Sequence, residues 1–238
     1  MARAAGAQVA RLGRILDALE TFHGRQTVRW PTEPYAFLVW WHCGYPASEE
    51  RCSRGWESLN QEIGFTPEKL LQAPSFRLAR ALKPGGMVPE LRAGRLKQIA
   101  RQVVEQCNGD LHSALRRLTL AQARTLLKKF PGISDPGADR ILLFGGIATV
   151  AAVPSSCPEV LVRIESGRPH EKYNVNYRDA QQIVQSQVAD TFAARTRAFL
   201  LVQRHARQLC KRSNPKCSVC PIAGSCAFSA ATAGARTR

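Results

Sequence analysis

Acidic residues are scarce in this chain, and its carboxyl-terminal part has none after Asp190. Over all 238 residues, 18 Asp and Glu stand against 34 Lys and Arg, which gives a formal charge of +16 at pH 7. The stretch after Asp190 therefore carries charge of one sign, and such a stretch concentrates positive potential. The balance indicates a polyanionic partner, and nucleic acid is the commonest polyanion that basic globular proteins bind.

Long apolar segments are also missing. A long run without a charge, residues 141–158, is interrupted by Gly145, Gly146 and Pro154, which is typical of a helix end followed by a loop and excludes a membrane span there. The basic amino terminus has no apolar core behind it, which excludes a secretory signal. We expect a cytoplasmic protein, nucleoid-associated if bacterial, with no membrane partner. In a reducing compartment its eight cysteines need not form disulfides.

No segment alternates between apolar and polar residues as a β-strand does, and no internal repeat is visible. Apolar residues instead recur at helical spacing over most of the chain. We predict an all-α protein whose first helix ends near Gly24. Further helices are predicted over residues 34–43, 91–107, 115–130, 135–144, 177–188 and 191–210.

Four cysteines lie close together near the carboxyl end, at Cys210, Cys217, Cys220 and Cys226, with six, two and five residues between them. The chain between them is short, polar and rich in turn residues, so a metal centre has to replace the missing apolar core. A set of four cysteines can bind a zinc ion or a 4Fe–4S cluster. Zinc ribbons more often use two Cys-x-x-Cys pairs, and here there is one. The other four cysteines are scattered and are interpreted as small buried apolar residues.

A second motif lies at residues 127–144, where one predicted helix ends, Pro131 and Gly132 turn, and another helix begins. Asp135 suits the cap of the second helix and Pro136 its first position. Such a hairpin can offer backbone N–H groups to a phosphate, since Gly132 lets a DNA backbone approach and the new helix terminus is electropositive. An ordinary packing corner between two helices would have the same sequence. The residues expected to contact DNA here are Lys128, Lys129, Gly132, Ile133 and Ser134.

Together the two motifs resemble the helix-hairpin-helix DNA glycosylase superfamily (HhH-GPD), of the endonuclease III and adenine glycosylase type. In that family a Pro-Gly-Val-Gly hairpin precedes a cysteine loop of this spacing, and His205 and Arg207 match the stretch before its first cysteine. The resemblance implies a bilobal all-α fold. Residues 1–31 would form a helix that packs with the cluster domain, residues 32–148 a six-helix barrel, and residues 149–238 a helical domain with the cluster loop.

The resemblance also implies a function. Members of this superfamily bind double-stranded DNA and flip the damaged base out of the stack, because the glycosidic bond cannot be reached inside a duplex. We therefore expect a 4Fe–4S cluster on the four cysteines, a base-excision repair activity, a DNA duplex as the partner, damaged or bent, and a monomeric protein. Basic residues of the cluster loop that match the family's DNA-contacting residues are Lys211, Arg212 and Lys216.

Proline stands where the family has functional side chains. The lysine that forms a Schiff base in lyase members falls at Pro136, and the aspartate that acts on the sugar falls at Pro154. The glutamine that fills the gap left by the flipped base falls at Pro46. Proline offers no group for acid–base or nucleophilic work, so Schiff-base lyase chemistry is not expected from the usual position.

Other side chains are candidates for the missing roles. The carboxylates of Asp135 and Asp139 lie at the start of the hairpin's second helix, and Glu49 and Glu50 are further acids. Tyr45 or Trp41 could enter the base stack. For each residue an ordinary structural role is the competing interpretation, namely a helix cap for Asp135, the solvated surface for Asp139, Glu49 and Glu50, and the core for Trp41. The leading hypothesis for the function is a divergent DNA glycosylase. The alternative is a DNA-binding module of the same fold without catalytic activity. A third hypothesis is a zinc-containing RNA-binding protein.

Overall fold

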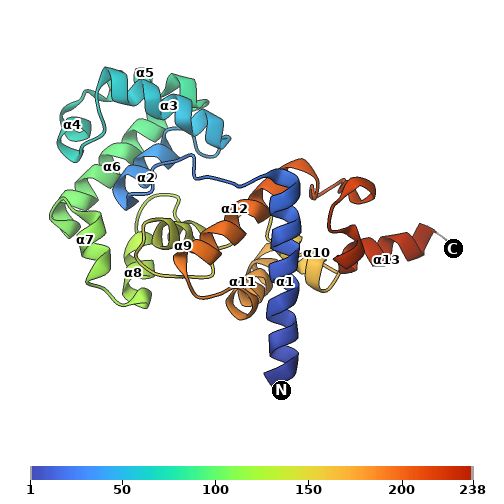
Figure 1. The fold of residues 1–238 in the computed structure, drawn as a ribbon. Helices are drawn as coiled ribbons and strands as arrows, with labels where there is room; N and C mark the ends of the chain where they lie inside the picture. Colours follow the sequence, from blue (N-terminus) through green and yellow to red (C-terminus); the bar gives the residue numbers. More distant parts are fainter. Residues whose placement is uncertain (1, 237–238) are drawn as a thin grey trace. The chain divides into compact units, whose positions relative to one another are not determined.

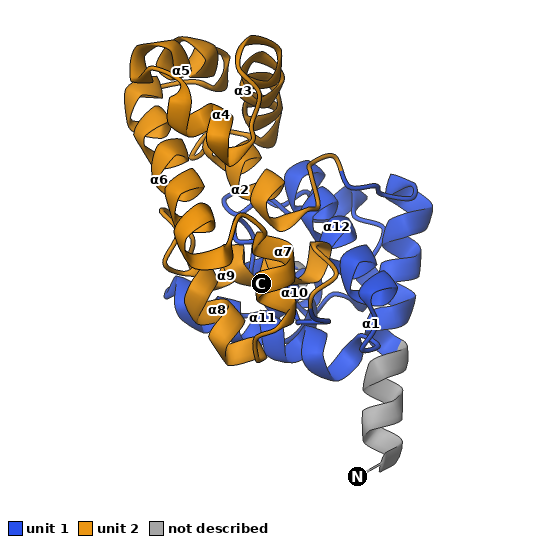
Figure 2. Ribbon diagram, turned by 90° about the vertical axis from the view of Figure 1, so that its left-hand side faces the viewer, with its two compact units in different colours: residues 1–28, 148–238 blue, residues 29–147 orange. Residues whose placement is uncertain are grey.

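The computed structural model describes the backbone of residues 2–236 and the side chains of residues 11–232. This part of the chain consists of helices and loops, without a β-strand (Figure 1). The prediction of an all-α protein is confirmed. The chain forms two compact units, which Figure 2 shows in blue and orange. Unit 1 combines residues 1–28 with residues 148–238, and unit 2 contains residues 29–147.

Unit 2 is built around a long helix, α6, against which the helices α2, α4, α5 and α7 pack. The side chains of Leu96, Ile99 and Val103 on α6 are fully buried, as the helical spacing of residues 91–107 predicts. The helices of this unit are α2 (Pro34–His42), α3 (Glu49–Glu62), α4 (Pro67–Gln72), α5 (Ser75–Leu82), the 3₁₀ turn η1 (Lys83–Gly85), α6 (Pro89–Cys107), α7 (Leu111–Arg116), α8 (Leu120–Leu127) and α9 (Asp135–Phe144).

One predicted helix of this unit is two in the structure. Residues 115–130 were expected to form a continuous helix, but α7 ends at Arg116 and α8 begins at Leu120. Thr119 separates them with a capping box, in which its hydroxyl accepts from the Gln122 backbone N–H and the Gln122 side chain accepts from the Thr119 N–H. Local hydrogen bonding of Thr119 thus overrides the apolar periodicity of the segment.

Unit 1 brings the amino-terminal helix against the carboxyl-terminal third of the chain. Helix α1 (Ala2–His23) packs on α11 and α12, and it ends where Gly24 adopts a positive φ of 73°, as predicted. The other helices of the unit are α10 (Glu159–Glu165), α11 (Tyr173–Gln187), α12 (Phe192–Gln208), the 3₁₀ turns η2 (Cys217–Val219) and η3 (Ala223–Ser225), and α13 (Ala227–Arg236).

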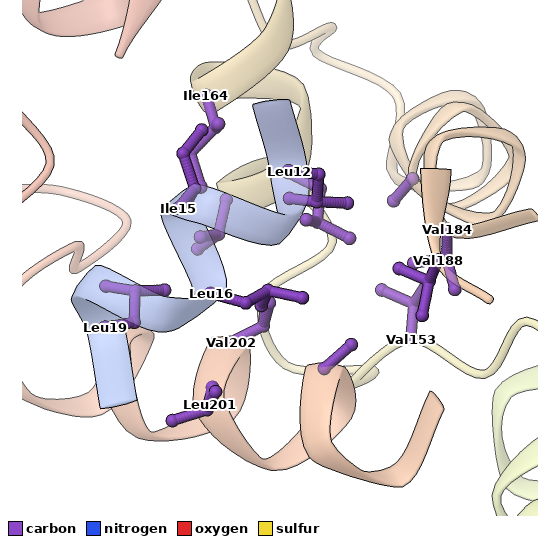
Figure 3. Close-up of a cluster of buried hydrophobic side chains, with 14 of the residues drawn as sticks. Leu12, Ile15, Leu16, Leu19, Val153, Ile164, Val184, Val188, Leu201 and Val202 are labelled. Carbon is purple, nitrogen blue, oxygen red and sulfur yellow. The ribbon is translucent and has the colours of Figure 1, made fainter. Parts of the chain in front are cut away.

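The core of unit 1 is a cluster of aliphatic side chains. Figure 3 shows Leu16 and Leu19 of α1 on the side of Val202 and Leu201 of α12, and Ile15 beside Ile164 of α10; each of these side chains, and Leu12, is less than 5% exposed. Each such side chain stabilises the folded state by about 1.5–3 kcal/mol when it leaves water. Three of the four clustered cysteines, Cys210, Cys220 and Cys226, pack against this core, so the loop is joined to the unit through its thiols.

Candidate metal centre and nucleic-acid interface

The four predicted metal ligands lie in unit 1 at the ends of short turns. Cys210 follows the last residues of α12, Cys217 opens η2, Cys220 closes it, and Cys226 closes η3. All four are half-buried and none forms a disulfide. They line one cavity, whose remaining walls include the apolar side chains of Ile164, Leu209, Ile222 and Phe228.

This arrangement fits a metal group larger than one ion. A zinc ion requires its four sulfur ligands at about 2.3 Å from a single point. Among the residues that the structure describes, no three His, Cys, Asp or Glu side chains converge closely enough to hold a single ion. The four thiols nevertheless line one common cavity. The donor set, all sulfur in an apolar pocket, is the one that iron–sulfur clusters use.

Arg163 of α10 connects the cysteine loop to the core of unit 1. Its guanidinium donates to the backbone oxygens of Lys211 at 3.0 Å and Arg212 at 2.7 Å, and it lies 3.7 Å from the Sγ of Cys210. The Sγ of Cys226 lies 3.6 Å from the Arg163 carbonyl oxygen. Because Arg163 is only 6% exposed, its charge is well placed to balance a buried anionic centre.

Without a metal the pocket favours neutral thiols. Burial raises the pKa of Cys210 and of Cys220 above the usual value, although the hydrogen bond from Arg163 opposes this shift at Cys210. Since the thiolate is the form that binds metal, loading the site has to release protons. We therefore expect metal binding and ordering of the loop to be a single coupled event.

The predicted hairpin lies in unit 2, between α8 and α9. Gly132 is exposed and has a φ of +66°, a backbone conformation that is strained for residues with a side chain. The fully buried His42 contacts the backbone of this turn, and its Nε2 lies 2.8 Å from the Pro131 carbonyl oxygen. Burial lowers the pKa of His42 to about 4, so the ring is neutral and donates to this carbonyl.

The hairpin offers fewer groups to a phosphate than its sequence suggests. The backbone N–H groups of Gly132 and Ser134 have no hydrogen-bond partner among the described residues. Ile133 differs from expectation, because its side chain is 7% exposed and its N–H donates to the Phe130 oxygen. Ser134, and not Asp135, is the cap residue of α9, and Pro136 is therefore its second residue. This shift makes Ser134 the electropositive end of the helix.

The basic residues predicted to contact DNA are exposed. Lys128 forms an ion pair with Asp135 at 2.9 Å, while the side chain of its neighbour Lys129 faces solvent. On the cysteine loop Lys211, Arg212 and Lys216 are all exposed.

The four carboxylates considered in the sequence differ in their surroundings. Asp139 is 1% exposed and accepts from Arg124 at 2.8 Å. Glu49 pairs with the buried Arg140 at 2.7 Å. The expectation that Asp139 and Glu49 are solvated surface residues is therefore wrong. Asp135 and Glu50 are exposed. Salt bridges of this kind hold a carboxylate in a structural role, so Asp139 and Glu49 are poorly placed to act on a substrate.

Aromatic residues of α2 form a packed group. The guanidinium of Arg140 lies 3.9 Å from the ring centre of Trp30 and also faces Phe37. Trp41 and Tyr45 stack on one another with their ring centres 4.7 Å apart, and both are half-buried. A ring that is already stacked has to leave its partner before it can enter a base stack, which favours a structural role for Trp41.

Three features of the structure were missed by the sequence analysis. Met87 and Val88 are 85% and 56% exposed, and Val88 has a positive φ of 48°, which is rare for a β-branched residue. Glu159, the first residue of α10, is only 9% exposed, and no hydrogen bond or ion pair of the described residues reaches its carboxylate. Two patterns in the sequence could have indicated these residues. One is the apolar pair Met87 and Val88 directly after Gly85 and Gly86, and the other is the acidic Glu159 between Pro158 and an apolar run.

Comparisons with known proteins agree with the cysteine motif. Residues 210–226 match the family model described as the iron-sulfur binding domain of endonuclease III. The thymine/uracil-DNA glycosylase of Pyrobaculum aerophilum is 26% identical over 165 residues, which are 68% of this chain and 67% of that protein.

Solved structures with the same fold cover nearly the whole chain. A thermostable thymine-DNA glycosylase matches with a TM-score of 0.73 and 17% identity, covering 96% of this chain and 99% of that chain. A non-covalent endonuclease III–DNA complex matches with a TM-score of 0.71 and 15% identity, covering 95% of this chain and 98% of that chain.

The chain therefore has the helix-hairpin-helix fold seen in solved DNA glycosylase and endonuclease III structures. Its residues 210–226 are similar to the iron-sulfur binding domain of endonuclease III. None of its described helices is long and apolar enough to cross a membrane.

Proposed function

We propose that this protein is a DNA N-glycosylase that removes uracil or thymine from damaged double-stranded DNA by hydrolysis, without lyase activity, and that it acts as a monomer. The observation that carries the proposal is the presence in one chain of the exposed Gly132 hairpin and the endonuclease III cysteine loop. The choice of base follows the relative that is named a thymine/uracil-DNA glycosylase. The net charge of +16 supports binding to DNA.

We further propose that Cys210, Cys217, Cys220 and Cys226 hold a 4Fe–4S cluster. The cavity that the four thiols share, and the lack of convergence on one point, support a cluster over a zinc ion. The cluster would supply a rigid anchor for the loop. Lys211, Arg212 and Lys216 would then reach DNA phosphates from a fixed backbone.

Within unit 2, three neighbouring loops support a continuous DNA-binding surface. A Cβ atom added to Gly132 would lie 3.9 Å from the ring of Tyr45, so the hairpin adjoins the loop after α2. A Cβ atom added to Gly86 would lie 3.8 Å from the Cβ of Ala47, so the loop before α6 also adjoins the loop after α2. Phosphate contacts at Gly132 and Ser134 would thus be next to the exposed Met87 and Val88.

Met87 and Val88 are suited to entering the base stack. The buried Arg92 fixes their loop, because its guanidinium donates to the backbone oxygens of Gly86 at 2.6 Å and Met87 at 3.1 Å. Backbone strain such as that at Val88 costs about 1–3 kcal/mol and is concentrated at functional sites. Apolar side chains that project from a DNA-binding surface commonly wedge between bases and unstack them.

The substitution Met87→Ala tests this role. We expect base release from duplex DNA to fall roughly tenfold, since a truncated wedge no longer offsets the unstacking of the target base. Release from a single-stranded substrate should be unchanged, because no stack has to be opened there. Phe76→Ala is the matched control, since Phe76 on α5 is also an exposed apolar residue, at 75%. An equal loss on both substrates would contradict a wedge.

Hydrolysis requires a group that assists departure of the base, and the usual positions are occupied by Pro136 and Pro154. We propose Glu159 for this role. Its carboxylate is largely buried and free of ion pairs within the described residues, unlike those of Asp139 and Glu49. A desolvated carboxylate can activate water or stabilise positive charge that develops on the sugar.

Incubation of the purified protein with duplexes that contain uracil, mispaired thymine, an oxidised base or an abasic site tests the proposed activity. We expect release of uracil and thymine, and no borohydride-trapped adduct with the abasic duplex, because proline replaces the lysine at 136. A trapped adduct would contradict the hydrolytic mechanism. Tight binding without base release from any duplex would support the second candidate function, a DNA-binding module without activity. The prolines at the family's catalytic positions, Pro136 and Pro154, favour this candidate.

A further inference from the structure

Two histidines form a chain of hydrogen bonds that ends at a cysteine of the proposed cluster. His205 of α12 is 1% exposed, and its Nε2 lies 3.8 Å from the Sγ of Cys220. Its other ring nitrogen, Nδ1, lies 3.2 Å from the Nε2 of His23 at the end of α1. His23 Nδ1 in turn lies 2.7 Å from the side-chain amide of Gln208.

The direction of donation follows from the outer end of the chain. Arg204 can only donate, and its Nη2 lies 2.7 Å from the side-chain amide of Gln208, so Gln208 presents its oxygen to Arg204. The Gln208 nitrogen then faces His23 Nδ1 and donates to it. A neutral His23 consequently carries its proton on Nε2 and donates to His205 Nδ1.

The same logic determines the state of His205. Since its Nδ1 accepts from His23, a neutral His205 carries its proton on Nε2, which faces Cys220 Sγ. Each link in the chain therefore has one donor and one acceptor.

We infer that Arg204, Gln208, His23 and His205 form a positioning relay that holds an N–H donor on the Cys220 sulfur and thereby raises the reduction potential of the cluster. This inference rests on the iron–sulfur centre proposed above. A hydrogen bond to a cluster thiolate stabilises negative charge, and it stabilises the more negative reduced form most. The amino-terminal helix, through His23, thus belongs to the metal centre although it supplies no ligand.

The test is a measurement of the cluster's midpoint potential on the full-length, iron-loaded protein and its variants, with iron content determined on the same samples. His205→Phe should move the potential to a more negative value, because it removes the donor. His23→Phe should give a smaller shift in the same direction, because it removes the group that fixes the His205 tautomer. His205→Gln, whose amide can still donate, should restore part of the loss. His170→Phe, the same change on a surface histidine of unit 1, is the control.

A double variant separates this relay from a general effect on packing. If His23 acts through His205, adding His23→Phe to His205→Phe should cause no further shift. An additional shift in that background, or an unchanged potential in His205→Phe, would overturn the inference. Since His23 is half-buried, its variant remains informative if His205→Phe does not fold. A wild-type protein without iron would instead overturn the proposed centre itself.

Discussion

Replacement of Cys210 with serine should leave the protein almost free of iron and unfold residues 210–226. Ile222 is the one buried side chain in this stretch, so the loop has almost no apolar core of its own. Structural metal centres contribute on the order of 10 kcal/mol to small domains that lack such a core. Iron content, the visible absorption spectrum and the thermal unfolding midpoint of Cys210→Ser would measure the loss.

Cys107→Ser is the matched control for that experiment. Cys107 lies at the end of α6 in unit 2, is 6% exposed and lines no part of the cysteine cavity. Its replacement buries a hydroxyl at a cost of about 1–3 kcal/mol but should leave iron content unchanged. Full iron content in Cys210→Ser, or loss of iron in Cys107→Ser, would show that the four thiols of the loop are not the ligands.

Features encoded over a few neighbouring residues were predictable from the sequence. Gly24 ends α1 because a glycine readily adopts the positive φ of a helix terminus, and the Pro131–Gly132 turn follows from the same property. The cysteine loop is equally local, since the short segment of residues 210–226 by itself matches the iron-sulfur binding domain of endonuclease III. Each of these signals needs no knowledge of which distant segments pack together.

Features that depend on distant partners were not predictable. Arg163 supports the cysteine loop from more than forty positions earlier in the chain, and His23 reaches His205 from the opposite end of the sequence. Asp139 looked like a solvated acid because nothing near it in the sequence indicates the ion pair with Arg124. The exposure of Met87 likewise depends on Arg92, whose buried guanidinium fixes the loop backbone. Tertiary contacts decide the role of a residue in all of these cases.

The substitution Glu159→Gln should reduce base release by about 100-fold or more while leaving affinity for duplex DNA unchanged. Glutamine keeps the size of the side chain, but it can neither accept a proton from water nor carry the negative charge that stabilises the positive charge developing on the sugar. Single-turnover rates on a uracil-containing duplex would measure the chemical step, and a binding titration at two salt concentrations would measure affinity. Glu171→Gln, the same change on an exposed glutamate of unit 1, should leave both quantities nearly unchanged.

Stability measurements on the same variant distinguish a chemical role for Glu159 from a structural one. Glu159 makes no hydrogen bond or ion pair among the described residues, so its replacement by glutamine breaks no contact that stabilises the fold. Glu159→Gln should therefore unfold at about the same temperature as the wild type. Loss of activity together with retained or increased stability is the pattern of a residue kept for function. A parallel loss of both would instead assign Glu159 to the packing of α10 and leave the hydrolytic group to be sought elsewhere.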